Sequence, residues 1–160
     1  MPIKIHDNLP ARKLLQNEIV DIIDSSTAEK QDIRPLKFLL LNLMPKKLET
    51  EVQFARLLSA SPLQIELTLM TTETYSPRNT KKEHLIEFYK TLEDINNNFY
   101  DVLIITGAPV ETVPFKKVKY WNELKNIISW SSRNVFRRIG VCWGAQALLK
   151  VLHNVEKHTM

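Results

Sequence analysis

The hydrophobic and polar positions of this chain follow two kinds of pattern in turn. Residues 36–44 are almost continuously apolar, which is typical of a strand buried on both faces of a sheet. Residues 47–61 then carry apolar side chains at helical spacing, and residues 63–71 return to a strand pattern. Pro45 and Pro62 separate the three segments. This part of the chain therefore predicts a strand, a helix and a second strand.

The same alternation continues through the rest of the chain. It predicts a loop and helix within 75–95, a strand over 101–106, a helix over 115–133, a strand over 135–142 and a helix over 144–155. Thr80 and Glu83 have the spacing of a capping box at the start of the first of these helices. In the last helix the side chains expected to face the core are Ala145, Leu148, Leu149 and Leu152.

Alternating strands and helices predict an α/β fold, with a parallel sheet and helices on both faces. Residues 1–33 have weak periodicity and are interpreted as an N-terminal arm with short helical pieces; residues 34–160 form the α/β domain. In such sheets the chemistry gathers at the carboxyl ends of the strands. The segments "NLMPKK" and "TGAPVE" and the residue Cys142 each follow a predicted strand, so we expect them at one edge.

Length and composition restrict the class of protein. A chain of 160 residues fits one domain with a substantial core. It contains no apolar run near ~18 residues, and its N-terminus lacks the apolar core of a signal peptide. A single cysteine cannot form an internal disulfide framework. These features predict a soluble cytoplasmic protein with no membrane partner.

Charge and ligand spacing argue against two further classes. The net charge is +4, and the basic residues are scattered along the chain, whereas nucleic-acid binders usually have a stronger and one-sided excess. The four histidines and one cysteine show no metal-ligand spacing. We therefore expect neither a nucleic-acid partner nor a metal site.

The only cysteine lies within Gly140-Val141-Cys142-Trp143-Gly144, which fits the pattern of a nucleophile elbow with Cys replacing Ser. Small neighbours allow a tight strand-to-helix turn, and the helix N-terminus favours the thiolate. The backbone N–H of Trp143 is a candidate oxyanion-hole donor, and Ala108 or Val110 of the "TGAP" loop is a candidate for a second.

The alternative for Cys142 is a buried structural cysteine at the end of a strand. A cysteine nucleophile normally works with a histidine base, and the candidates are His6, His84, His153 and His158. None of them follows a further predicted strand, where a base would be delivered, and His84 is expected to be exposed. The sequence thus predicts a nucleophile without an evident base.

Several segments together resemble one family. They are "IRPLKFLLLNLMPKKLETEVQFARLLSASPLQIEL", "SPRNTKKEHLIEFY", "FYDVLIITGAPVE", "YWNEL" and "VCWGAQALL". They are similar to the homoserine O-acyltransferases of methionine biosynthesis, whose better-known members are homoserine O-succinyltransferases. The resemblance implies a class I glutamine amidotransferase-like (flavodoxin-like) fold. It covers essentially the whole chain but about the N-terminal half of a normal member, so residues 34–160 are expected to be a truncated, incomplete acyltransferase domain.

The resemblance also implies a reaction and roles for single residues. An acetyl group passes from acetyl-CoA to Cys142 as a thioester, and then to the hydroxyl of L-homoserine. Trp143 matches the residue whose backbone N–H contributes to the oxyanion hole, and Glu111 matches the position linked to the choice of acyl-CoA. A glutamate there repels the free carboxylate of a succinyl group and so implies acetyl-CoA. Lys46 and Lys47 are candidates to contact substrate or CoA; their alternative is a solvated pair.

The family's triad histidine and glutamate lie in the half that the resemblance does not cover. One alternative is therefore a catalytically inactive fragment of such an enzyme. Others are succinyl-CoA as the donor, serine as the acceptor, or a cysteine hydrolase or glutamine amidotransferase subunit with the same elbow. The expected partners are small molecules, with acetyl-CoA as co-substrate and no bound cofactor, and a homodimer stays open.

Overall fold

The computed structural model describes residues 3–18, 20–23, 34–74 and 80–158. The strands are β1 (Ile3–Lys4), β2 (Ile22–Ile23), β3 (Leu36–Leu41), β4 (Ile65–Met70), β5 (Tyr89–Lys90), β6 (Tyr100–Ile105) and β7 (Val135–Gly140). The helices are α1 (Ala11–Asn17), α3 (Lys47–Ser59), α4 (Lys82–Phe88), α5 (Leu92–Ile95), α6 (Trp121–Asn134) and α7 (Trp143–His153), with a 3-10 turn η1 (Phe115–Lys117).

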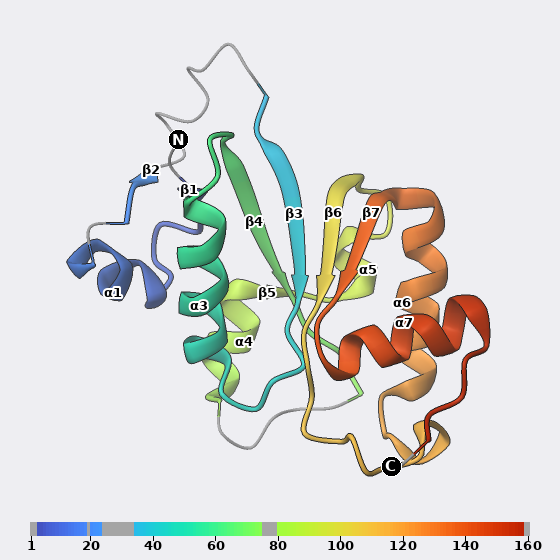
Figure 1. The fold of residues 1–160 in the computed structure, drawn as a ribbon. Helices are drawn as coiled ribbons and strands as arrows, with labels where there is room; N and C mark the ends of the chain where they lie inside the picture. Colours follow the sequence, from blue (N-terminus) through green and yellow to red (C-terminus); the bar gives the residue numbers. More distant parts are fainter. Residues whose placement is uncertain (1–2, 19, 24–33, 75–79, 159–160) are drawn as a thin grey trace.

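The strands form one sheet in the order β2-β1-β4-β3-β6-β7, with β5 paired to β4, and all pairings among the described strands are parallel. The predicted parallel α/β sheet is confirmed. The arrows of β3, β6 and β7 all point to the same lower edge in Figure 1. The loops that follow these three strands therefore meet at that edge, as the sequence predicts.

Both faces of the central strands are buried, which explains the continuous apolar pattern of β3. Leu39 and Leu41 pack with α6 and α7 in one core. Leu40 points to the other face and packs with α1 and α3 in a second core. A strand with helices on both sides has no face left for polar residues, so the alternation typical of half-exposed strands is absent.

The segment after β4 departs from the predicted single helix. Thr80 and Glu83 do not form a capping box, because α4 begins after Lys81 and its N-terminus has no side-chain cap. The helix ends at Phe88, and Tyr89–Lys90 pairs with β4 instead. Burial of Tyr89 against the core overrides the helical pattern at this point. A capping box does occur at the next helix, where Thr91 and Asp94 satisfy each other across the start of α5.

The last helix buries a different face from the predicted one. Leu148 is buried as expected, but Leu149 and Leu152 are 48% and 39% exposed, and Trp143 and Ala147 take the inward positions. The neighbouring strand β7 ends the described sheet and pairs with β6 alone. Apolar side chains are also exposed along this strand, with Phe136 at 70%. This corner of the molecule therefore presents an apolar strand edge beside an apolar helix face.

Two short strands of the predicted N-terminal arm belong to the sheet, which the weak periodicity did not indicate. β1 pairs with β4 and β2 pairs with β1, while α1 packs against α3.

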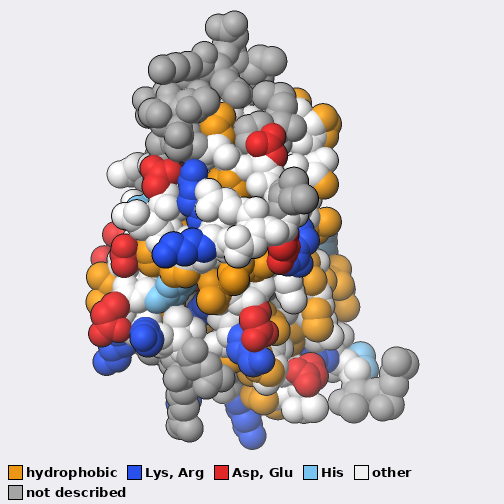
Figure 2. Space-filling model, turned by 90° about the vertical axis from the view of Figure 1, so that its left-hand side faces the viewer, with side chains coloured by type: hydrophobic (Ala, Val, Ile, Leu, Met, Phe, Trp, Pro, Cys, Tyr) orange, Lys and Arg blue, Asp and Glu red, His pale blue; other side chains and the backbone are white. Residues whose placement is uncertain are grey.

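Figure 2 shows acidic and basic side chains interspersed with apolar ones on one side of the molecule, without a field of a single sign. Among the described residues, no helix is both long and apolar enough to cross a bilayer.

Candidate active site

Cys142 lies in the turn between β7 and α7, at the N-cap of the helix. Its φ of 54° and ψ of −121° lie outside the regions that ordinary L-residues adopt, so the backbone is strained here. The cysteine is exposed, which removes the alternative of a buried structural thiol. The strand, turn and helix together match the predicted nucleophile elbow.

The glycines beside the thiol serve close packing, because none of the chain's three glycines has a positive φ. A Cβ on Gly140 would lie 2.5 Å from Ala145 Cα, and one on Gly144 would lie 2.4 Å from the carbonyl oxygen of Ile105. Gly107 also approaches the site, since its Cβ would lie 3.6 Å from Cys142 Sγ. The strain is thus carried by the cysteine itself, and the glycines let three backbones meet around it.

The thiol opens into a cavity of about 320 Å³ between α3 and the loops after β3 and β6. Its walls are Met44, Thr50, Gln53, Phe54, Thr106, Gly107, Ala108, Pro109, Val141 and Cys142. The sequence analysis named the "NLMPKK" and "TGAP" segments but did not single out Thr50, Gln53 or Phe54. Their spacing on one face of α3 is the signal that could have found them.

Thr106 joins the two loops that form this cavity. Its hydroxyl accepts a hydrogen bond from the Leu43 N–H at 2.8 Å and donates one to the Gly107 carbonyl at 3.0 Å. The side chain is 1% exposed, so both bonds form away from water. The threonine of "TGAP" therefore fixes the loop after β3 relative to the loop after β6.

The three oxyanion-hole candidates lie in different settings. The Trp143 amide is the first of α7, a position that has no acceptor within a helix. Ala108 lines the cavity of Cys142. The Val110 N–H donates to the Ala108 carbonyl at 2.8 Å, and its side chain lines a neighbouring cavity of about 250 Å³. A free amide is thus available at Trp143 but not at Val110, which already has a partner.

Glu111 is exposed on the loop after β6 and is not among the residues lining the cavity of Cys142. Its carbonyl accepts a hydrogen bond from Lys157 Nζ at 2.5 Å, and Val113 O accepts a second at 2.7 Å. The side chain of Lys157, in the segment after α7, therefore holds this loop by binding two of its backbone carbonyl groups. Glu111 itself is exposed, two residues beyond Pro109, which lines the cavity of Cys142.

The two lysines after β3 differ sharply in their surroundings. Lys46 is exposed and pairs with Glu49 at 3.0 Å, whereas Lys47 is 4% exposed and donates to the Asn42 carbonyl. Burial lowers the pKa of Lys47 from 10.5 to about 8, an effect that the nearby Glu51 carboxylate opposes. Both lysines line a separate cavity of about 560 Å³ on the other side of the loop, so the expectation of a solvated pair holds for Lys46 alone.

No histidine of the described chain lines the cavity of Cys142. His84, expected to be exposed, is only 14% exposed and lies 2.8 Å from the buried carboxylate of Glu51. His153 ends α7, at the opposite end of the helix from the thiol. Within the described residues no three His, Cys, Asp or Glu side chains are placed to hold a metal ion.

Comparison with known proteins now identifies the family. The sequence model of the family described as homoserine O-succinyltransferase matches residues 2–160. The chain belongs to this family. Curated relatives include a homoserine O-acetyltransferase of Shouchella clausii, 52% identical over 98% of this chain and 51% of its own length. The homoserine O-acetyltransferase of Bacillus subtilis (strain 168) is 49% identical over all of this chain and 53% of its own length. The chain thus spans about half the length of these relatives.

Proposed function

We propose that this chain carries the nucleophile of a homoserine O-acyltransferase and that Cys142 accepts an acetyl group from acetyl-CoA. The observation that carries the proposal is the exposed thiol on a strained turn at the N-terminus of α7, open to a cavity with largely apolar walls. Two relatives that are 52% and 49% identical to this chain over the aligned region are named homoserine O-acetyltransferases.

The chemistry proceeds in two transfers. The Cys142 thiolate attacks the carbonyl carbon of acetyl-CoA, the bond to the CoA sulfur breaks, and CoA leaves as a thiolate that takes a proton from water. The L-homoserine hydroxyl then attacks the new thioester, loses its proton to a base, and Cys142 leaves as a thiolate. The Trp143 N–H is the amide proposed to stabilise the oxygen that becomes negative in both steps.

The first transfer needs a nucleophile and a hydrogen-bond donor to the oxyanion, but it does not need bound homoserine. The second needs a base for the hydroxyl proton, and no described histidine reaches the cavity. We therefore assign formation of the acetyl-thioester to these residues. Transfer to homoserine needs a base that the described residues do not supply at this cavity, and the relatives, about twice as long as this chain, have further residues that could provide one.

The choice of acyl group is assigned to Glu111. Glu111 is exposed on the loop that contributes Pro109 to the cavity, and its negative charge would repel the distal carboxylate of a succinyl group bound against this loop. Lys46 and Lys47, which line the separate cavity on the other side of the loop after β3, are the candidates to attract the phosphates of CoA. Replacing Glu111 by glycine should then allow succinyl-CoA to react.

The test is the intact mass of the protein after incubation with acetyl-CoA or succinyl-CoA. We expect a single acetyl adduct, which is absent in Cys142→Ser, and a succinyl adduct in Glu111→Gly alone. Iodoacetamide labelling of the untreated protein provides the control that the thiol is accessible. An accessible thiol that takes no acetyl group from acetyl-CoA would overturn the proposal for this chain.

A further inference from the structure

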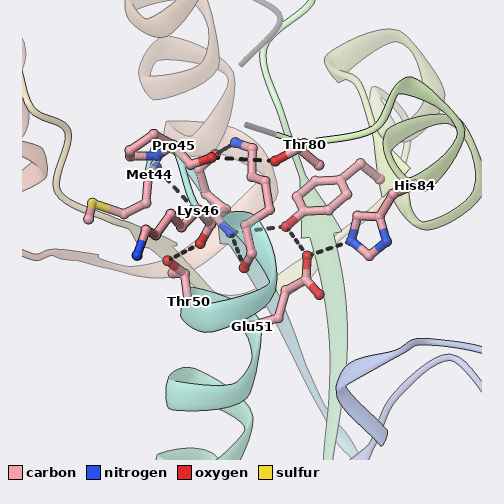
Figure 3. Close-up of polar contacts among 10 residues, drawn as sticks. Met44, Pro45, Lys46, Thr50, Glu51, Thr80 and His84 are labelled. Carbon is pink, nitrogen blue, oxygen red and sulfur yellow. Dashed lines mark hydrogen bonds and ion pairs between the residues drawn. The ribbon is translucent and has the colours of Figure 1, made fainter. Parts of the chain in front are cut away.

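A buried polar cluster lies behind the loop that follows β3, on the far side from Cys142. Glu51 of α3 is 1% exposed, and its Oε1 atom accepts hydrogen bonds from the Tyr89 hydroxyl at 2.6 Å and from His84 Nε2 at 2.8 Å. The Tyr89 hydroxyl accepts a hydrogen bond from Asn42 Nδ2 at 2.9 Å. Asn42 Oδ1 accepts a hydrogen bond from the Met44 N–H at 3.1 Å. Figure 3 shows Met44 and His84 at opposite ends of this cluster.

The donor and acceptor roles in this series of hydrogen bonds can be assigned in one way only. A carboxylate only accepts hydrogen bonds, so the Tyr89 hydroxyl must be the donor in its hydrogen bond with Glu51. Burial and the same carboxylate raise the pKa of Tyr89, which keeps that proton in place. The oxygen of Tyr89 can then only accept from Asn42, so the amide nitrogen of Asn42 turns towards it, and the same nitrogen donates to the Lys47 carbonyl at 3.4 Å. The amide oxygen is left facing the Met44 N–H.

The Met44 end of this hydrogen-bonded series reaches the candidate active site. Met44 lines the cavity of Cys142, and Met44 Sδ and Cys142 Sγ lie 3.8 Å and 3.6 Å from the position of a Cβ on Gly107. The thioether is therefore a wall of the space next to the thiol. A change in the direction of the Asn42 amide would withdraw the acceptor of the Met44 N–H and move that wall.

The cluster is costly for stability, which argues that it has another role. Glu51 Oε2 is buried and has no hydrogen-bond partner in the described part of the chain. Burying a carboxylate with one oxygen unsatisfied costs free energy that a well-packed apolar group would avoid. A polar network does, however, fix one geometry of the backbone it holds, where apolar packing tolerates several.

We propose that Glu51 and Tyr89 are positioning residues, which orient Asn42 and thereby place Met44 against the acyl-accepting thiol of Cys142. The consequence for activity rests on the proposed acetyl transfer, whereas the consequence for the position of Met44 does not. The two consequences are therefore measured separately.

The structural readout is the methyl NMR signal of Met44, assigned with Met44→Leu, in protein labelled at its four methionines. Tyr89→Phe removes one hydroxyl and should shift the Met44 signal. Glu51→Gln keeps an acceptor for Tyr89 and should retain the wild-type signal. His84→Gln is the matched control, because His84 contacts the same oxygen but leads away from Met44.

The activity readout is the rate at which acetyl-CoA acetylates Cys142, compared with the rate of alkylation by iodoacetamide. Displacement of a cavity wall by about 1 Å slows a positioned reaction by roughly tenfold to a hundredfold. We expect that loss of acetylation in Tyr89→Phe alone, with alkylation unchanged because a small reagent needs no positioning.

Three results decide the matter. A folded Tyr89→Phe protein with the wild-type Met44 signal would overturn the inference. A shifted Met44 signal without acetylation of the wild-type protein would refute the proposed function for this chain and leave the positioning role standing. If Tyr89→Phe does not fold, the wild-type protein still decides, because a nuclear Overhauser contact between the Tyr89 hydroxyl and the Asn42 side-chain amide is required and its absence refutes the inference.

Discussion

Gly144 offers a test in which two effects of known sign oppose each other. The residue lies in the first turn of α7, where alanine is favoured over glycine by about 1 kcal/mol on helix propensity alone. A Cβ at this position would lie 2.4 Å from the Ile105 carbonyl oxygen and 2.6 Å from that of Thr106. An ordinary C···O contact is about 3.3 Å, so α7 would have to move by roughly 0.9 Å from the end of β6.

Overpacking of this kind typically costs about 1–3 kcal/mol, and here both contacts are backbone atoms of a central strand, which cannot rotate away. We therefore expect Gly144→Ala to be destabilised by about 2 kcal/mol after the gain in propensity is counted. Urea unfolding followed by tryptophan fluorescence measures this, since Trp143 is fully buried beside the site. Ala145→Gly is the control for propensity and should lose about 1 kcal/mol. A Gly144→Ala protein as stable as the wild type would refute the close-packing explanation of this glycine.

Three further predictions concern charge and the exposed edge. The pKa of Lys47 is about 8 in the folded chain and 10.5 in the unfolded chain, so the unfolded chain binds more protons between these pH values. The free energy of unfolding of the wild type should therefore rise by up to about 3 kcal/mol from pH 8 to 10.5, compared with that of Lys47→Met. Urea titrations at several pH values measure this. Hydrogen bonds from Arg34 lower the pKa of Asp101 from 3.8 to about 2. The contribution of this carboxylate to stability, at most about 1 kcal/mol, should therefore be present above pH 4 and lost towards pH 2. The free energies of unfolding of Asp101→Asn and of the wild type should converge as the pH falls through this range. Phe136→Lys should reduce concentration-dependent association in sedimentation velocity, whereas Ile86→Lys, which replaces an exposed isoleucine of α4, should not.

The sequence predicts the layers of this fold because the central strands carry an unmistakable signal. Residues 36–41 are apolar except for Lys37, since helices cover both faces of the strand, and the alternation with helical segments predicts a parallel sheet. The pattern fails after β4, where the burial of Tyr89 ends a helix that periodicity alone would continue. It also fails on α7, whose exposed leucines have the same chemistry as buried ones. Local patterns report how apolar a segment is and leave open which neighbour covers it.

The candidate site divides in the same way. Cys142 could be found from sequence, because the glycines of the elbow leave a recognisable spacing. The arrangement of Glu51, Tyr89 and Asn42 could not, since the three residues are far apart in the chain and belong to α3, β5 and the loop after β3. Only the parallel pairing of β5 with β4 brings the Tyr89 hydroxyl to α3.

The strain at Cys142 is held by contacts among the described residues of this chain. Trp143 follows the cysteine directly, and its ring packs against Phe115, Tyr120 and Trp121 with centroids 6.0, 6.0 and 6.4 Å away. A residue at φ 54° costs of order 1–3 kcal/mol and persists only where the surrounding structure determines it. The buried indole and the close contact of Gly144 with β6 provide that determination on the helix side. Because these contacts lie within this chain, the proposed thioester formation is the step that the chain should carry out by itself.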